Sequence, residues 1–134
     1  MTSADTSVII PACAPWHPAH QVAREALDGG LRLIAHCAVE TYSVLTRMPP
    51  DQRVDPAKVQ VLLEDFFPEE PLMLSAARMH TLVAELVQRG VSGGAVYDGL
   101  IALTAAEFGA ELVTLDQRAE RTYRQCGVNY RMLA

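Results

Sequence analysis

The chain has 134 residues, of which 50% are hydrophobic in type and 20% are charged. A chain of this size buries enough surface to hold a core without disulfides or structural metals, so we expect a single domain over residues 1–134. Its 11 basic and 16 acidic residues give a formal net charge of −5, which excludes binding of nucleic acid by overall charge alone.

In the first half of the chain, short apolar runs of strand length alternate with helical patterns. Thr6 and Ser7 are good helix N-caps, and Asp55 followed by Pro56 is typical of a helix start. Paired glycines and paired prolines end the helices that precede them. We therefore expect, in order, a strand ending near residue 5, a helical turn, a helix from about 18, a strand at 31–35, a helix from about 38 and a helix from 56.

The second half continues the same alternation. Residues 71–74 predict a short strand, and Ser75 is a suitable N-cap for the helix after it. That helix has apolar residues at helical spacing, which we expect to form its core face: Met79, Leu82, Val83, Leu86 and Val87. We further expect a helix at 96–108, a strand at 111–115, a helix at 117–125 and a fifth strand at 128–133.

The alternation of strands and helices favours a parallel sheet covered by helices on both faces. We therefore predict an α/β fold, a three-layer α/β/α arrangement with a mainly parallel sheet of about five strands. In such a sheet the carboxyl ends of the strands and the N-termini of the helices gather along one edge, where α/β folds bind ligands.

Four acidic residues fall at junctions between the predicted elements. Asp5 and Asp116 follow predicted strands, whereas Glu40 and Asp98 fall in the first turns of predicted helices. Taken singly, an acid after a strand is equally well explained as a helix N-cap. Because all four would face one crevice at the edge of the sheet, the joint arrangement favours a functional site.

Such a group of carboxylates is costly without a partner. Two like charges about 4 Å apart repel by about 4 kcal/mol at an effective dielectric constant of 20. The repulsion is relieved if some groups are protonated or if a cation lies among them. Hard oxygen donors suit Mg²⁺ or Mn²⁺, and such a cation can activate water for phosphodiester hydrolysis.

Three stretches of the sequence resemble one known family. Residues 5–9 (Asp-Thr-Ser-Val-Ile) resemble the opening of PIN domains, and residues 38–42 (Ala-Val-Glu-Thr-Tyr) resemble their second helix region. The match is most specific at residues 98–116, where an Asp opens an Ile-Ala-x-Thr-Ala helix and Gly, a short strand and Thr-x-Asp follow. A PIN domain of this size resembles the VapC toxins of bacterial toxin–antitoxin pairs.

The resemblance implies a ribonuclease that depends on Mg²⁺ or Mn²⁺ and cuts structured RNA such as tRNA or ribosomal RNA. It also implies a homodimer, and a VapB-type antitoxin that covers the acidic groove. Carried over residue by residue, it makes metal-binding and catalytic acids of Asp5, Glu40, Asp98 and Asp116, and supporting hydroxyls of Thr6, Ser7 and Thr114.

Three arginines follow the last of these acids. Arg118, Arg121 and Arg124 recur every three residues beside Asp116, and Arg118 stands where many PIN domains carry a further acid. One interpretation is that they hold RNA phosphates or the acidic groups of a partner, which makes Arg118 an RNA-binding residue. The other is a solvated helix face paired with Glu120.

Other conspicuous residues favour a structural role or none. Trp16 is expected to be buried against the first helix, and His17 and His20 to be surface residues. The three scattered cysteines predict neither a disulfide framework nor a zinc site. No apolar run approaches the roughly 18 residues of a membrane span, and the N-terminus lacks the basic start of a signal peptide. We therefore expect a cytoplasmic protein with no membrane partner.

Together these observations predict a metal-dependent endoribonuclease, a hydrolase of phosphodiester bonds. Asp5, Asp98 and Asp116 would hold the cation, and Glu40 would bind it directly or orient the attacking water. The alternative is a module of the same fold that binds RNA or a partner protein without cutting.

Overall fold

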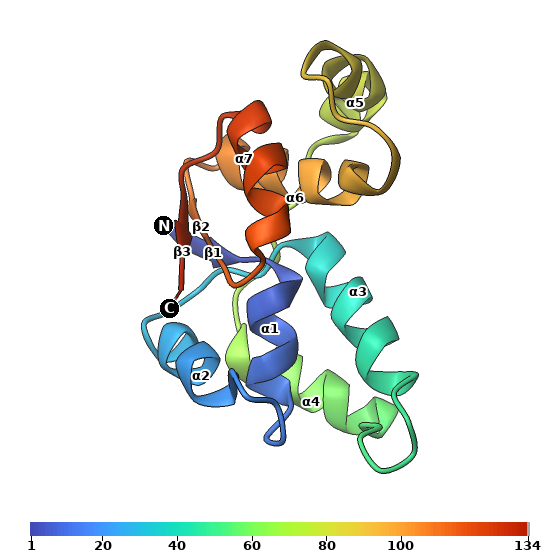
Figure 1. Ribbon diagram of the computed structural model, residues 1–134, viewed down its shortest axis with the longest axis vertical. Helices are drawn as coiled ribbons and strands as arrows, with labels where there is room; N and C mark the ends of the chain where they lie inside the picture. Colours follow the sequence, from blue (N-terminus) through green and yellow to red (C-terminus); the bar gives the residue numbers. More distant parts are fainter. Residues whose placement is uncertain (134) are drawn as a thin grey trace.

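Three short parallel strands lie between helices in the computed structural model, which describes residues 1–133 (Figure 1). The strands are β1 (Thr2–Ala4), β2 (Glu111–Thr114) and β3 (Tyr130–Met132). The α-helices are α1 (Thr6–Cys13), α2 (His20–Asp28), α3 (Ala35–Thr46), α4 (Pro56–Phe66), α5 (Ala76–Gln88), α6 (Val96–Glu107) and α7 (Glu120–Cys126). Two short 3-10 helices, η1 (Gly93–Ala95) and η2 (Gln117–Ala119), precede α6 and α7.

Strand β2 is the centre of the sheet. It pairs in parallel with β1, where Ala4 lies opposite Val113, and with β3, where Leu112 lies opposite Tyr130. Leu112 and Val113 are fully buried because α1 and α6 both pack against this strand. Figure 1 shows α1 and α2 on one side of the strands and α6 and α7 on the other, which is the predicted three-layer α/β/α arrangement.

The prediction of about five strands is wrong, because only three regular strands form in residues 1–133. The segments expected as strands at 31–35 and 71–74 extend the sheet by single bridges, Ser3 with Arg32 and Ile34 with Leu72. Neither segment stays extended long enough for a ladder. Ile34 is already the N-cap of α3, and Pro71 has no N–H to donate.

Helix α3 begins earlier than the sequence indicates. It starts at Ala35, directly after the Ile34 bridge, and not near Ala38. Glu40 therefore lies in the second turn of this helix and not in the first turn that we expected. The backbone N–H of Ala35 donates to the carbonyl of Leu72 (2.9 Å), which fixes the start of α3 against the edge of the sheet.

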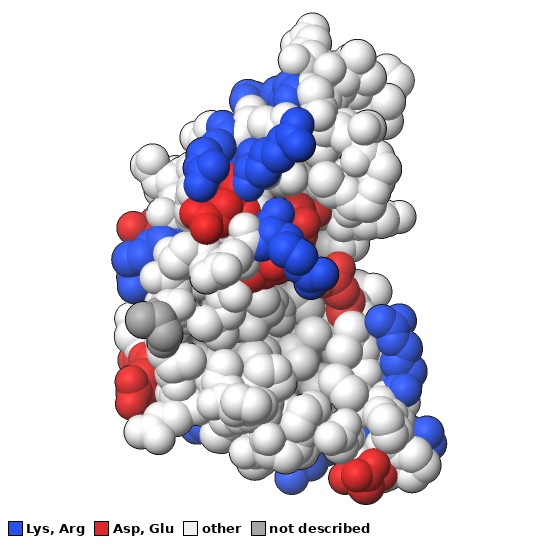
Figure 2. All heavy atoms as spheres, viewed as in Figure 1, with Lys and Arg blue, Asp and Glu red and all other residues white. Residues whose placement is uncertain are grey.

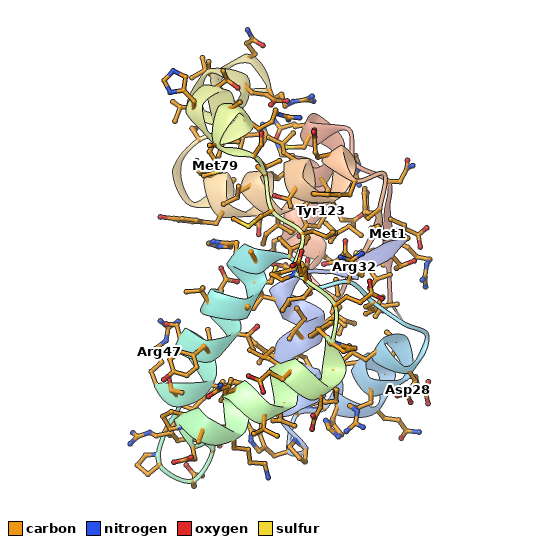
Figure 3. All side chains as sticks on the ribbon, turned by 180° about the vertical axis from the view of Figure 1, so that it is seen from behind. Met1, Asp28, Arg32, Arg47, Met79 and Tyr123 are labelled. Atoms are coloured by element: carbon orange, nitrogen blue, oxygen red, sulfur yellow. The ribbon has the colours of Figure 1, made fainter. Side chains whose placement is uncertain are left out.

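The apolar face predicted for α5 is only half buried. Leu82 and Leu86 are 7% and 5% exposed, whereas Met79, Val83 and Val87 are 47%, 72% and 73% exposed. In Figure 1 this helix stands at one end of the molecule, away from the sheet, and Figure 3 shows Met79 at that end. The prediction of a five-residue core face was wrong because the protein covers only one side of α5, the side that packs on α6.

Two further expectations can be compared with the structure. The expectation that Trp16 is buried was wrong: it lies in the loop between α1 and α2 and is 41% exposed. The three cysteines are buried and free. Within residues 1–133, every helix falls short of the length and apolar character that a membrane crossing requires.

The N-cap predicted at Ser75 is confirmed and gives a stability test. Its hydroxyl accepts a hydrogen bond from the backbone N–H of Arg78 (3.1 Å) at the start of α5. We expect Ser75→Ala to lower the free energy of unfolding by about 1 kcal/mol, because it leaves that N–H without its cap. Urea denaturation followed by circular dichroism measures the change.

Ser92 provides the matched control, because it is the N-cap of η1 but its side chain makes no capping hydrogen bond. Ser92→Ala should change the free energy of unfolding by less than about 0.5 kcal/mol. Equal losses for the two variants would contradict the role given to the Ser75 hydroxyl.

Candidate active site

Asp5 is the most buried of the predicted acids, with 3% of its surface exposed. It follows β1 and is the N-cap of α1, where its Oδ1 accepts from the backbone N–H of Ser7 (3.0 Å). The Ser7 hydroxyl donates to the same oxygen. The hydroxyls of Thr114 and Tyr123 both donate to Oδ2, each at 2.5 Å. Three hydroxyls and one amide therefore surround this carboxylate.

Burial and hydrogen bonding act on the Asp5 carboxyl in opposite directions. Burial is the larger effect and raises its pKa, since it disfavours the charged form. The donors on Ser7, Thr114 and Tyr123 lower the pKa, because they stabilise the carboxylate. The site thus holds a carboxylate out of water with neutral donors only.

The hydroxyls of Ser7 and Thr114 also tie Asp5 to the end of β2. The Ser7 hydroxyl accepts from the backbone N–H of Leu115 (2.8 Å), and the Thr114 hydroxyl accepts from that of Asp116 (3.0 Å). Each hydroxyl therefore relays a hydrogen bond from the β2 exit to one oxygen of Asp5. This arrangement sets the position of Asp116 relative to Asp5, although 111 residues separate them in the chain.

Asp98 lies in the first turn of α6, as the sequence predicts. Burial, followed by the negative charges of Asp116, Asp5 and Glu40, raises its pKa to about 6, and only Arg118 opposes the rise. Carboxylates that shift each other's pKa in this way lie near one another. The other three predicted acids are therefore near enough for their charges to act on Asp98.

Glu40 and its neighbours form one wall of the site. The Nε2 atom of His36, one turn earlier on α3, lies 3.2 Å from Oε2 of Glu40. The His36 ring stacks on the ring of Tyr97, with centroids 5.5 Å apart and planes 9° from parallel. Because Tyr97 immediately precedes Asp98, this stack links the start of α3 to the start of α6.

Asp116 and Arg118 lie together after the end of β2. Asp116 is the N-cap of η2, and its Oδ1 accepts from the backbone N–H of Arg118 at 3.0 Å. The Nε atom of Arg118 lies 3.5 Å from the same oxygen, while 94% of the Arg118 side chain is exposed. The guanidinium group is thus held close to the acids but remains open to solvent.

Glu40, Asp116 and Arg118 all line one cavity of about 540 Å³. Ser7, in its lining, connects it to buried Asp5. Thr6 lines the same cavity, but no hydrogen bond in residues 1–133 joins its side chain to Asp5. Figure 2 shows acidic side chains directly below a group of basic side chains, and Figure 1 places α7 in the same region. The predicted site residues in the lining are Thr6, Ser7, Glu40, Asp116 and Arg118.

The donor set suits a hard divalent cation, although it is not arranged around one. All four acids offer carboxylate oxygens, the ligands that Mg²⁺ and Mn²⁺ prefer. Within residues 1–133, no three His, Cys, Asp or Glu side chains form a ready group of metal ligands. Side chains of the cluster would have to turn toward a cation. The raised pKa of Asp98 indicates that positive charge would be favourable there.

Tyr123 is a site residue that the sequence reasoning missed. It lies in α7, and Figure 3 shows it in the interior, where it is 0% exposed. In the sequence it looks like an ordinary core aromatic, because nothing near it marks a buried acid as its partner. The one clue to its role is that the hydroxyl of a buried tyrosine needs a hydrogen-bond acceptor.

Comparison with known proteins identifies the family of the chain. The pattern of the PIN domain family matches residues 4–125, a range that contains all four acids. Proteins named Ribonuclease VapC40, from Mycobacterium tuberculosis strains CDC 1551 / Oshkosh and ATCC 25618 / H37Rv, are 44% identical over 133 residues, 99% of this chain and of each relative. Ribonuclease VapC27 of strain ATCC 25618 / H37Rv is 45% identical over 131 residues, 93% of this chain and 91% of the relative.

The raised pKa of Asp98 predicts a pH-dependent stability. Because the folded protein holds this proton more tightly than the unfolded chain, the metal-free protein loses stability as the pH rises from about 4 to about 6. Asp98→Asn removes the charge, so we expect it to stabilise the protein by about 1 kcal/mol at neutral pH, after allowance for solvent screening. Urea denaturation in EDTA at several pH values measures this gain in stability, which should vanish below about pH 4, where Asp98 is protonated in both states.

Asp51→Asn is the control for this measurement, because Asp51 is exposed in the loop before α4. Its unfolding free energy should follow that of the unmodified protein across the same pH range. A loss of stability in Asp98→Asn at neutral pH would contradict the repulsion within the acidic cluster.

Proposed function

This chain belongs to the PIN-domain family and is of the VapC type, and we propose that it is a metal-dependent endoribonuclease, the toxin of a toxin–antitoxin pair. The names of two relatives, Ribonuclease VapC40 and Ribonuclease VapC27, support the ribonuclease activity. We propose structured RNA, such as tRNA or ribosomal RNA, as the substrate, Mg²⁺ or Mn²⁺ as the cofactor and the cytoplasm as the location.

One observation carries the proposal: three acids from separate parts of the chain place their negative charges near a fourth, Asp98. The charges of Asp5, Glu40 and Asp116 each raise the pKa of Asp98. A fold does not benefit from such repulsion, because each close pair of like charges costs free energy. Binding of a divalent cation gives the cluster a purpose that N-capping alone does not.

Different residues of the chain would have different roles in hydrolysis. Asp5, Asp98 and Asp116 would hold the cation, and Glu40, in the cavity wall, would bind it or orient the attacking water. When bound, the cation would lower the pKa of a coordinated water and neutralise charge on the phosphate. The backbone N–H of Ser7 and the hydroxyl of Thr114 would keep Asp5 in place by their hydrogen bonds.

Arg118 supplies positive charge at the entrance to the site. Its exposed guanidinium group lines the cavity and lies 3.5 Å from Asp116. Arg124, by contrast, already pairs with Glu120 and the hydroxyl of Tyr130. Of the arginines in this region, Arg118 is therefore the residue that we propose contacts an RNA phosphate.

Asp98→Asn tests the nuclease activity. We expect it to lower the rate of RNA cleavage by about two orders of magnitude, the usual effect of removing one group that stabilises charge in the transition state. The assay incubates purified protein with labelled tRNA and ribosomal RNA in Mg²⁺ or Mn²⁺, and EDTA should stop the reaction. Asp51→Asn should cleave at the unmodified rate.

Asp5→Ala is a poorer test of mechanism than Asp98→Asn. Its side chain accepts hydrogen bonds from Ser7, Thr114 and Tyr123 inside the protein, so removing it leaves buried donors without a partner. Loss of activity in that variant would mix a catalytic defect with a folding defect. Asp98 is more accessible, and Asn keeps its shape.

The assay also distinguishes the second candidate, a PIN-like module that binds RNA or a partner without cutting. Arg118 among the acids favours that candidate, since it adds a phosphate contact to the cavity. RNA that is retained on the protein but stays intact in both Mg²⁺ and Mn²⁺ would support the binding module. Cleavage that a folded Asp98→Asn protein performs at the unmodified rate would refute the nuclease mechanism.

Two protein partners belong to the proposal. The first is a VapB-type antitoxin that covers the acidic cavity. The second is another copy of this chain, bound through the apolar face of α5. Met79, Val83 and Val87 recur at intervals of four residues, so they lie on one side of the helix, and each is at least 47% exposed. An apolar stripe of this kind favours association with another apolar surface.

Val83→Glu tests the homodimer. It puts a charge in the middle of the exposed stripe, so we expect the purified protein to change from dimer to monomer in light scattering coupled to size-exclusion chromatography. Val61→Glu, at an exposed position of α4, should leave the molecular mass unchanged. A dimer that survives Val83→Glu would place the interface elsewhere.

A further inference from the structure

Tyr123 has a buried hydroxyl for which the packing of the protein gives no reason. It is the largest of the fully buried side chains in residues 1–133, and its hydroxyl reaches from α7 to Oδ2 of Asp5 (2.5 Å). Phenylalanine would fill the same volume without needing an acceptor. We propose that Tyr123 is a positioning residue, which fixes Asp5 so that its Oδ1 atom is presented to the divalent cation.

The hydrogen bonds of Asp5 account for its whole accepting capacity. A carboxylate offers about four lone-pair positions, two on each oxygen. Oδ1 accepts from the amide and the hydroxyl of Ser7, and Oδ2 accepts from the hydroxyls of Thr114 and Tyr123. A cation can therefore reach Asp5 only where one of these donors gives way.

The two oxygens differ in which donor can give way. The Oδ2 donors, Thr114 and Tyr123, lie in the interior, where both side chains are fully buried. The Oδ1 donor, Ser7, lines the cavity and is only partly buried. Its hydroxyl also lies 3.3 Å from the hydroxyl oxygen of Thr114, which gives its proton another acceptor. Oδ1 is therefore the oxygen that Ser7 can release to a cation.

Tyr123 adds a constraint that Ser7 and Thr114 cannot supply. Their hydroxyls relay hydrogen bonds from the backbone at the β2 exit, so they follow the movements of that strand. The Tyr123 hydroxyl comes from α7 and holds Oδ2 from a different direction. Groups that orient a metal ligand from behind change metal affinity by about 10-fold to 100-fold when they are removed.

Tyr123→Phe tests the inference, which rests on the proposed function only in assuming that Asp5 binds a cation. We expect the dissociation constant for Mn²⁺, measured by electron paramagnetic resonance without RNA, to rise about tenfold. In RNA cleavage, we expect kcat to fall while KM for RNA stays the same, because Tyr123 is buried away from the substrate. Circular dichroism establishes that the variant is folded.

Tyr130→Phe is the matched control. The Tyr130 ring lies against that of Tyr123, with centroids 5.8 Å apart, but its hydroxyl donates to Glu120 (2.8 Å) and accepts from Arg124 (3.1 Å). The same change made beside Tyr123 should therefore leave Mn²⁺ affinity and kcat unaltered. Equal losses of affinity in the two variants would mean that general packing is responsible, and the inference would be overturned.

The outcomes separate this inference from the proposed function. If the unmodified protein binds Mn²⁺ tightly but cuts no RNA, and Tyr123→Phe weakens Mn²⁺ binding, the inference stands and the nuclease proposal fails. If RNA is cut and Tyr123→Phe binds Mn²⁺ normally, the inference fails alone. An unmodified protein that binds no divalent cation overturns both.

A second measurement applies if Tyr123→Phe does not fold. In nuclear magnetic resonance of the unmodified protein, the hydroxyl proton of Tyr123, assigned through its ring protons, should exchange slowly with water. It should persist when Mg²⁺ saturates the site, because the cation binds at the other oxygen. Loss of this signal on addition of Mg²⁺ would overturn the inference.

Discussion

The structure of the site depends on keeping one carboxylate, that of Asp5, almost out of water. Burying an ionised carboxylate costs several kcal/mol unless hydrogen bonds replace its hydration. Here the replacements come from Ser7 on α1, Thr114 on β2 and Tyr123 on α7. Because these elements are far apart in the chain, the site forms only when the N-terminal strand and the C-terminal helix have both packed on the sheet.

The remaining acids are arranged at the expense of stability. Burial and three neighbouring carboxylates raise the pKa of Asp98 to about 6, so much of its surroundings favours the uncharged form. Asp116 offsets part of its own cost by capping η2. Glu40 lies 3.2 Å from the Nε2 atom of His36. A cation bound at such a site would remove repulsion that folding has already imposed.

The sequence predicts the helix positions of Asp5 and Asp98 better than it predicts the sheet, for physical reasons. Asp5 and Asp98 could be located because each starts a helix, and local patterns mark helix starts. The segment around Arg32 looked like a strand because the pattern of apolar residues does not reveal how many residues pair with a neighbouring strand. In that segment, all of which the structure describes, only Arg32 pairs with β1, through Ser3. Val83 was assigned to the core because an apolar stripe does not reveal whether this chain or another molecule covers it. Tyr123 was missed because its acceptor is distant in sequence.

The choice of hydroxyls as partners for Asp5 also bears on function. A lysine or arginine would compensate the buried charge equally well, but it would neutralise the carboxylate and take the place of a cation. Hydroxyls and an amide replace the lost hydration while leaving the negative charge intact. Within residues 1–133, only two of the four acids lie within 4 Å of a basic side chain, Glu40 beside His36 and Asp116 beside Arg118. Asp5 is thus surrounded by donors that carry no positive charge, and the positive charge of a cation would favour its ionised form.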